Sequence, residues 1–529
     1  MISTSDTNDT TTGEKPGSPW GIFLVLMVGS FIAIEAATFQ APAMPTIGKH
    51  FGISEDATAL LVLLYYLGLV VFSPIFGRVA DSYGRKKVIC LGLSGFIISE
   101  CAAALAQSFP FLVAARFIQG LSVACILPVV LSYVAYLFPQ EKRGLPLGVL
   151  VFSMSLGATT GALLGGVLID AFGWRSIYWT SAAMGALGLL LIFWRVPETP
   201  PAKQRYHLDW PGAVLLLLTV GTLLSVPTWM SNNGIFSHQA MMSLALGLCL
   251  LAILWRFEKR ANSPVFDTQI MGNKDFLLPC LIYLLFLVCH GGAVYSLVFF
   301  ISGRPDGNAS QAGLMNMCLF AASMLAGLAS GKLADRLDER RLIIGVVMMM
   351  LGNLLVYALF LDLSTPFWIV LVLAIMLGAS QGMKGPVIMK LALSNVPPEK
   401  ISAGSGLLTM MRDFGTPAGV SIGLAIFSST RQSTTLSSLE DQATSIGLNS
   451  PEALGALKTA FANSSAADLP SLQTALASQN TSFEQLLSVA KLDGLASTLP
   501  AVGGILIAVI SLALILAISL SKSVKRPAV

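Results

Sequence analysis

Apolar segments of roughly twenty residues recur along the whole chain, and this recurrence restricts its fold more than any other feature. Hydrophobic residues make up 54% of the 529 residues and charged residues only 11%, far outside the range of soluble globular domains. A segment of this length crosses about 30 Å of hydrocarbon as an α-helix, and lipid requires every backbone group to be satisfied internally. Hydropathy therefore predicts an all-α polytopic membrane protein with fourteen transmembrane helices.

The charged and sulfur-containing residues argue against several other classes of function. The net charge of +4 is dispersed over short loops, so no basic face for nucleic acid is expected. All seven cysteines fall in apolar segments without a C-x-x-C pair, so we predict neither disulfides nor a metal site. The chain has no G-x-x-x-x-G-K-[ST] loop for ATP and no nucleophile–base constellation in its spans, so we do not expect an enzyme.

A polar loop, GRVADSYGRKK, begins at Gly77 and separates the second and third apolar segments. Its glycines, Gly77 and Gly84, permit tight backbone positions where two spans reverse direction. Arg85 and Lys86 hold that end of the hairpin in the cytoplasm. Asp81 follows the end of its span, so its carboxylate is free to sit at the positive N-terminus of another helix. The loop therefore predicts a conformational latch, with a simple topology anchor as the alternative.

A degenerate copy, GKLADRLDERR, follows the tenth segment, with Asp335 and Arg336 kept and Asp338 in place of the second glycine. The first copy resembles the G-x-x-x-D-x-x-G-R-K loop of major facilitator superfamily transporters, and such a recurrence is typical of a duplicated transporter. The resemblance implies the major facilitator fold, with two six-helix halves and alternating access. It also implies that Asp81 meets the N-terminus of a second-half helix that begins near Ser402.

The spans and loops divide the chain into domains. We predict a disordered cytoplasmic tail (1–20), a six-helix half (21–195), two extra spans (210–256), a second six-helix half (277–521) and a cytoplasmic tail (522–529). Most Lys and Arg fall in loops that this layout places inside, so both termini are expected in the cytoplasm. Six, two and six spans resemble the fourteen-span drug:proton antiporter branch, which implies the cytoplasmic (inner) membrane.

Within the second half, residues 429–498 form a long external loop rich in Ser, Thr and Ala. Apolar residues recur at helical spacing around Leu457 and around Leu486, and Ser450-Pro451 is a plausible helix start. We expect two or three short amphipathic helices at the outer face rather than an independently folded domain.

Charged residues inside the predicted spans are the main functional candidates. Glu35 lies in the first span, where a charge costs about 2.5–3.5 kcal/mol on insertion scales. In the fourth span, Arg116 and Gln119 resemble the R-x-x-Q-G motif of the superfamily. Counting about 1.5 Å per residue places Glu35 and Arg116 at one depth, so we expect the pair to meet when the outer side closes. Structural roles stay open: a hydrogen-bonded Glu35, an Arg116 that reaches the headgroups, and an interfacial Glu100 in the third span.

The fifth span contains GATTGALLGG, which resembles the antiporter signature G-x-x-x-G-P-x-x-G-G with Ala162 in place of the proline. Gly157, Gly161 and Gly165 recur every four residues, and Gly166 follows. This spacing predicts a bare stripe on which another helix packs closely. The missing proline leaves the direction of transport open.

The second half offers fewer motifs, but it carries several polar side chains within its spans. His290 lies in the ninth span, Lys384 in the twelfth, and Arg412 and Asp413 in the thirteenth. The candidate proton-coupling residues are Glu35, Arg116 and Asp413. The candidate substrate-cavity residues are Glu35, Thr38, Gln119, His290, Lys384 and Arg412. The candidate latch residues are Gly77, Asp81, Gly84, Arg85, Lys86, Asp335 and Arg336.

These features predict a proton-coupled secondary transporter that exports small amphipathic compounds by alternating access, with no cofactor besides the proton gradient. A proton-coupled uptake permease for a small metabolite is the alternative, and a membrane sensor or enzyme is the rival from another class. The expected partners are a small-molecule substrate, protons and the lipid bilayer, with a periplasmic adaptor added if the cell is Gram-negative. The charge of the substrate stays open, because the candidate acids and bases are balanced in number.

Overall fold

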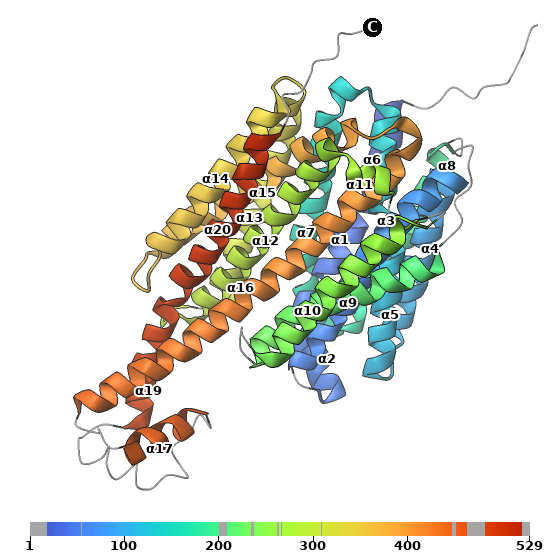
Figure 1. The fold of residues 1–529 in the computed structure, drawn as a ribbon. Helices are drawn as coiled ribbons and strands as arrows, with labels where there is room; N and C mark the ends of the chain where they lie inside the picture. The colour runs from blue at the N-terminus through green and yellow to red at the C-terminus, as the bar shows by residue number, and fades with distance from the viewer. Residues whose placement is uncertain are drawn as a thin grey trace, which may run out of the picture.

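The computed structural model describes residues 18–53, 55–199, 209–233, 237–261, 264–265, 267–307, 309–446, 451–462 and 482–520. Within them every α or β element is an α-helix, and Figure 1 shows the long helices running side by side in one bundle. The first part of the chain forms α1 (Pro19–Thr38), α2 (Gln40–Phe51), α3 (Glu55–Tyr83), α4 (Arg85–Ala104), α5 (Phe109–Val123), α6 (Leu127–Leu137), α7 (Gly144–Phe172) and α8 (Arg175–Arg195). The rest forms α9 (Trp210–Asn233), α10 (His238–Glu258), α11 (Thr268–Gly272), α12 (Lys274–Gly303), α13 (Ala309–Ala334), α14 (Glu339–Leu359), α15 (Phe367–Ser394), α16 (Ile401–Ser445), α17 (Pro451–Ala462), α19 (Phe483–Ala496) and α20 (Thr498–Ser519).

Twelve helical segments among the described residues are long and apolar enough to cross a membrane. The two other predicted spans are helical as well, but they fall outside this set. The apolar part of α9, Trp210–Val226, is short. In α16 the charged residues Arg412 and Asp413 and many serines and threonines interrupt the apolar sequence. The chain is therefore a multi-pass helical membrane protein, and the fourteen-span layout stays a prediction.

The helices before α9 and those after α11 pack by the same scheme. In the first set α1 packs on α7, α3 on α5, and α4 on α8; in the second set α12 packs on α16, α13 on α15, and α14 on α20. The two sets meet where α3 contacts α16 and where α7 contacts α13. This correspondence is the structural counterpart of the duplicated loop motif, and we call the two sets the N-half and the C-half.

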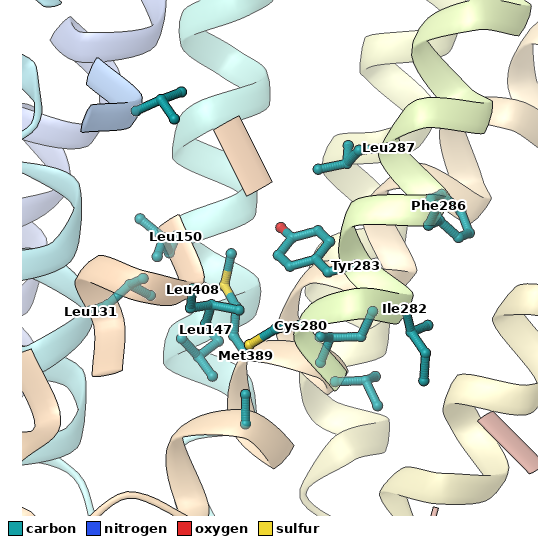
Figure 2. Close-up of a cluster of buried hydrophobic side chains, with 14 of the residues drawn as sticks. Leu131, Leu147, Leu150, Cys280, Ile282, Tyr283, Phe286, Leu287, Met389 and Leu408 are labelled. Carbon is teal, nitrogen blue, oxygen red and sulfur yellow. The ribbon is translucent and has the colours of Figure 1, made fainter. Parts of the chain in front are cut away.

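The buried apolar core is continuous from one half to the other. Figure 2 shows Tyr283 projecting from α12 toward Leu147 and Leu150 of α7, with Met389 and Leu408 nearby. All five side chains are buried in one cluster. Apolar contact therefore holds the halves together near the loop that precedes α7.

The pair α9 and α10 lies against the side of the bundle, as Figure 1 shows. Helix α9 packs on α3 and on α16, whereas α10 packs mainly on α9. Because α3 and α16 belong to different halves, α9 covers one of the two lines along which the halves meet.

The segment predicted as a long loop is more helical than expected at its start. Helix α16 continues as one element to Ser445, well beyond the predicted span end at 428. The two expected amphipathic helices are present as α17 and α19, and α17 begins at Pro451 as predicted. Leu439, Leu457 and Leu486 belong to a small apolar cluster that joins α17 and α19 to the end of α16. We call residues 429–445 with α17 and α19 the cap; it lies at the end of the bundle where α2 is found (Figure 1).

Candidate functional site

A buried polar network connects three helices of the N-half. The guanidinium of Arg116 on α5 donates to the side-chain oxygen of Gln119, and the amide nitrogen of Gln119 donates to the carboxylate of Glu100 on α4. Arg116 also donates through Nε to the carbonyl of Leu61 at 3.4 Å and lies 4.7 Å from the ring centroid of Tyr65 on α3. Arg116, Gln119 and Glu100 are each at most 2% exposed. The guanidinium is therefore held inside the bundle and does not extend to the headgroups.

Glu35 lies on α1 and is only 1% exposed. Neither oxygen of its carboxylate has a hydrogen-bond partner among the described residues. No hydrogen bond joins Glu35 to Arg116 in this conformation, in which Gln119, one helical turn away, accepts from the guanidinium. The contact expected when the outer side closes stays a prediction. Glu35 is close enough to Glu100 to interact electrostatically with it, and Glu100 is joined to Arg116 through Gln119.

The span that carries Glu35 and the span that carries Arg116 are each interrupted beyond these residues. The first span breaks between α1 and α2 at Phe39, four residues after Glu35. The fourth breaks between α5 and α6, where Cys125 and Ile126 donate to carbonyls three residues earlier. Pro128 follows, and it has no N–H for the carbonyl of Ala124. Discontinuous helices at membrane depth mark binding sites in many transporters.

The glycine stripe of α7 packs against α1 beside Glu35. A Cβ on Gly157 would lie 2.6 Å from the carbonyl oxygen of Phe31, and one on Gly161 would lie 2.1 Å from Oγ1 of Thr38. Thr38 Oγ1 donates to the carbonyl of Glu35 at 2.9 Å, so its hydroxyl is used within α1. Gly165 is also buried, whereas a Cβ on Gly166 would meet nothing within 4 Å. The packed face therefore includes Gly157 and Gly161 and leaves Gly166 outside.

In the C-half, Arg412 and Asp413 form a buried ion pair on α16. Nη2 of Arg412 lies 2.6 Å from Oδ1 of Asp413, and Nε donates to the same oxygen at 2.7 Å. Nη1 of Arg412 approaches Sδ of Met154 on α7 at 3.9 Å. The other carboxylate oxygen of Asp413 has no partner among the described residues. Through Met154 the pair reaches α7 of the N-half, although α16 itself packs on α3 and α6 of that half.

Lys384 on α15 and His290 on α12 are also buried in the C-half. The Lys384 ammonium donates to the backbone carbonyl of Gln381 at 3.1 Å and to the side-chain oxygen of the same residue. It lies 5.4 Å from the ring centroid of Tyr283 and 5.0 Å from that of Phe286, both on α12. Lys384 therefore points into the bundle rather than toward either membrane surface.

The polar motif at the junction of α3 and α4 is helical except at Gly84, and its Asp81, which was expected beyond the end of its span, lies in the last turn of α3. The motif contacts the other half as the resemblance implies. Oδ2 of Asp81 accepts from the backbone N–H of Ala403 at 2.9 Å, and Oδ1 accepts from that of Ser402 at 3.3 Å. Arg85 donates through Nε to Oγ of Ser402 at 3.0 Å and lies 3.4 Å from Asp81. The carboxylate thus occupies the positive N-terminus of α16. We call this set the Asp81 contact.

The two glycines of that loop serve different purposes. Gly84 adopts φ +103°, a left-handed conformation that favours glycine, between α3 and α4. Gly77 lies inside α3, and a Cβ there would be 2.3 Å from the carbonyl oxygen of Ser402. The prediction of a tight backbone position is correct for Gly84 and wrong for Gly77, which instead permits close approach of α16. The side chain of Lys86 lies 5.3 Å from the ring centroid of Phe193 on α8.

The degenerate loop copy makes the symmetry-related contact. Oδ1 of Asp335 accepts from the N–H of Gly144 at 2.7 Å, and Oδ2 accepts from that of Leu145 at 3.0 Å, at the start of α7. The ammonium of Lys390 on α15 lies 3.2 Å from Asp335 and 3.3 Å from Glu339. Arg336 is partly exposed in the turn between α13 and α14. We call this set the Asp335 contact.

Asp338, which replaces the second glycine of the copied motif, is the N-cap of α14. Its carboxylate accepts from the N–H of Arg340 at 2.9 Å. An N-cap carboxylate satisfies a free donor of the helix terminus, so the departure from the motif has a local structural role.

The contacts of two residues, Glu100 and Lys390, were not predicted from the sequence. Glu100 was open to a structural or functional reading, and the structure shows it joined to Arg116 through Gln119. Lys390 was not singled out, because it lies one residue beyond the predicted span 366–389, whereas α15 continues to Ser394. Lys384 and Lys390 are six residues apart, so they lie on different faces of one helix. This spacing could have indicated that their surroundings differ. No group of side chains among the described residues could hold a metal ion.

A bundle of two similarly packed halves, with buried charges between interrupted helices, defines the class of membrane transporters. The family comparison agrees: residues 26–420 match the model of the Major Facilitator Superfamily. The chain belongs to this superfamily and is a transporter rather than an enzyme, and members of the family need no cofactor.

Several curated relatives are named for multidrug resistance, and others for drug efflux. The chain is 29% identical over 398 residues to "Multidrug resistance protein Stp" of Mycobacterium tuberculosis (strain CDC 1551 / Oshkosh), covering 75% of this chain and 73% of the relative. It is 24% identical over 420 residues to "Multidrug resistance protein 3" of Bacillus subtilis (strain 168), covering 78% and 80%.

Among solved structures, the human organic anion transporter MFSD10 (TETRAN) has a TM-score of 0.59 and 19% identity, with 79% of this chain and 95% of that chain covered. The proton:xylose symporter XylE has a TM-score of 0.56 and 16% identity, with 76% and 87% covered. At these identities the likeness concerns the fold alone.

Proposed function

We propose that this protein is a proton-coupled secondary transporter that exports small amphipathic compounds across the cytoplasmic membrane by alternating access. The observation that carries the proposal is a pair of buried carboxylates in unlike surroundings: Glu100 is joined through Gln119 to the guanidinium of Arg116, whereas Glu35 has no hydrogen-bond partner among the described residues. Relatives that are named as efflux pumps support the outward direction.

The charge balance of this network requires a proton. If both carboxylates were ionised beside one guanidinium, a net negative charge would be buried in the bundle. A buried charge without a partner is costly, and the group is neutralised instead. Gln119 links Arg116 to Glu100, whereas Glu35 has no partner among the described residues. We therefore assign the stored proton to Glu35 in this conformation.

The exchange step follows from a rearrangement around Arg116. When the guanidinium turns from Gln119 toward Glu35, it favours the ionised carboxylate, and the proton leaves toward whichever side is open. When Arg116 returns to Gln119, Glu35 takes up a proton again. Arg116 thus regulates proton loading, and Asp413, which is already paired with Arg412, is the second candidate carrier.

The membrane layout belongs to the same proposal. We propose that α9 and α16 cross the membrane with the twelve apolar helical segments, which restores fourteen spans with both termini in the cytoplasm. The polarity of α16 is compatible with a span, because Arg412 and Asp413 are buried against each other inside the bundle. The Asp81 and Asp335 contacts then lie on the cytoplasmic side and keep it closed.

Proton-driven flux through Glu35→Gln liposomes tests the proposal. A screen of dyes, antibiotics and organic acids for altered accumulation in expressing cells first supplies a substrate and the direction of transport. We expect Glu35→Gln to abolish flux driven by a pH gradient while the protein stays folded. The control is Glu484→Gln, the same change at an exposed position on α19 of the cap.

Two results would contradict parts of the proposal. Wild-type flux and proton stoichiometry in Glu35→Gln would place the proton carrier elsewhere, with Glu100→Gln and Asp413→Asn as the next variants. Higher accumulation of the substrate in expressing cells would replace export by the uptake of a metabolite.

A further inference from the structure

Lys384 is a buried cation that has only neutral partners. Its side chain is 3% exposed, and its two hydrogen bonds both go to oxygens of Gln381. Tyr283 and Phe286 cover it from α12. An ammonium has three N–H donors, so one donor remains for another group.

The charged neighbours of Lys384 do not neutralise it. Arg412 and His290 are the ionisable groups that interact with it, and both are bases. Asp413 is the acid in this region, and its Oδ1 is held by Arg412. Arg412 and Asp413 balance each other, so a protonated Lys384 has no counter-charge among these groups.

Lys390 provides an internal comparison on the same helix. It is also buried, but its ammonium lies within 3.3 Å of carboxylate oxygens of Asp335 and of Glu339. Lys390 is thus a buried lysine with a structural role, and two carboxylates from neighbouring elements neutralise its charge. At Lys384, six residues earlier, no carboxylate of the described residues lies within ion-pair distance, so a structural ion pair does not explain its presence.

We propose that Lys384 binds the anionic group of the transported compound, so that the substrates include amphipathic carboxylates or sulfonates. This inference rests on the proposed function, and it narrows the substrate class. A buried unpaired cation is costly, and an arriving anion removes that cost while it gains a charge-assisted hydrogen bond. The unpartnered Nδ1 of His290 is a further polar group on the same side of the bundle.

The aromatic residues beside Lys384 indicate what the rest of such a compound contacts. Tyr283 and Phe286 of α12, in the C-half, lie next to its ammonium. Tyr283 also points toward Leu147 and Leu150 of α7, in the N-half (Figure 2). An aromatic or alicyclic body beside the anion would therefore contact side chains of both halves, as alternating access requires of a substrate.

Three probes of one shape and different charge test the inference: 2-naphthoate, 2-naphthamide and 2-naphthylmethylammonium. Their equilibrium affinities are measured by calorimetry on the full-length protein in neutral detergent. We expect 2-naphthoate to bind at least about tenfold more tightly than the other two, which corresponds to about 1.4 kcal/mol. Lys384→Gln should remove this preference by weakening 2-naphthoate alone.

Two further variants separate charge from folding. Lys384→Arg keeps the positive charge and should keep the preference for 2-naphthoate, even if Lys384→Gln proves unstable. Lys491→Gln makes the same change as Lys384→Gln at an exposed position of the cap and should leave all three affinities unchanged.

Several outcomes would overturn the inference: no binding of 2-naphthoate by the wild type, equal affinity for the three probes, preference for the cation, or an unchanged preference in Lys384→Gln. None of these depends on the proton carrier, because the measurement is made at equilibrium without a gradient. The three probes could fail in one of these ways while a pH gradient still drives flux through the wild type and not through Glu35→Gln. That combination would exclude an anionic substrate and retain the proton-coupled exporter.

Discussion

Gln119 joins a guanidinium to a carboxylate through a single amide. Its oxygen accepts from Arg116 and its nitrogen donates to Glu100. The opposite orientation of the amide would set donor against donor and acceptor against acceptor, because a guanidinium has no acceptor and an ionised carboxylate has no donor. The chemistry of its two neighbours therefore determines how this side chain lies.

Replacing Gln119 by leucine should both destabilise the protein and alter proton coupling. Leucine keeps most of the volume but removes the partners of two buried polar groups, at a cost of about 1–3 kcal/mol for each. Arg116 then becomes free to approach Glu35. We expect a lower midpoint of thermal unfolding in detergent and a changed pH profile of substrate-driven proton release.

Gln432→Leu makes the same substitution at an exposed position of α16 and serves as the control. An unchanged pH profile in folded Gln119→Leu would show that the amide is structural and does not control the proton.

The sequence identified the charged residues of the N-half but did not indicate that Arg116 is joined to Glu100 through Gln119. Depth along a helix can be counted from a span boundary, which placed Glu35 and Arg116 together. Which side chain Arg116 contacts depends on the rotation of α1, α4 and α5 about their axes, and a hydropathy pattern does not contain that information. The sequence showed that Glu100 is a charged residue within a span, but it did not predict its connection to Arg116 through Gln119.

At the scale of the element, the glycines of α7 show how a sequence pattern becomes a contact. Four-residue spacing places Gly157 and Gly161 on one face, and that face meets the backbone of α1. The same contact lies beside Glu35, so the position of the carboxylate depends on close packing of the two helices. The α7 stripe therefore supports the candidate site directly.

Gly157→Ala should separate α1 from α7 and destabilise the protein by about 1–3 kcal/mol, the usual range for an overpacked core. The added methyl group would lie 2.6 Å from a backbone oxygen, which cannot rotate away. Gly166→Ala is the matched control, because a Cβ there meets nothing within 4 Å and alanine raises helix propensity by up to about 1 kcal/mol.

Thermal unfolding of the two purified variants in detergent measures the difference. Equal midpoints for Gly157→Ala and Gly166→Ala would mean that α1 and α7 are not closely packed in the folded protein.

Helix α16 illustrates an element whose length was underestimated. Its span was predicted to end at 428, since the residues that follow are polar, yet the helix continues to Ser445. Polar residues can extend a helix when tertiary contacts support it, and here α19 packs on the extension. A Cβ on Gly494 would lie 2.1 Å from Oγ1 of Thr435, so the two helices cross closely.

At the scale of the whole molecule, the Asp81 and Asp335 contacts join the halves at two related places. In each, a carboxylate from one half occupies the N-terminus of a helix in the other half. The cationic partners differ, because Asp335 is paired with Lys390 of α15, whereas Asp81 lies beside Arg85 of α4, which also donates to Ser402 of the other half. The two contacts are therefore related by duplication but are supported by different side chains.

Asp81→Asn should shift the population toward the conformation that is open at this end. The interaction of a carboxylate with a helix N-terminus contributes about 0.3–1 kcal/mol, and up to about 2 kcal/mol when partly buried, which changes populations severalfold. Distances between spin labels at Lys87 and Arg341, on opposite halves near the contacts, should gain a longer component. Labels at Asp170, in the last turn of α7, and at Ser364, beyond the end of α14, should gain a shorter one.

Asp338→Asn is the control, because asparagine also caps helices well and Asp338 caps α14 within one half. Identical distance distributions for Asp81→Asn and the wild type would contradict a latch at this contact.

The sequence by itself determined the class of the protein, the positions of most helices, and the contact of Asp81 with the start of α16. The class and the helix positions follow from local hydropathy, which lipid enforces along each span, whereas the Asp81 contact was implied by the resemblance of its motif to that of the superfamily. Only the tertiary structure decided that Arg116 meets Glu100 through Gln119, that Gly77 serves packing, and that Lys384 lacks the carboxylates given to Lys390. Each depends on how helices rotate and approach one another, and those degrees of freedom are set by packing between segments distant in the chain.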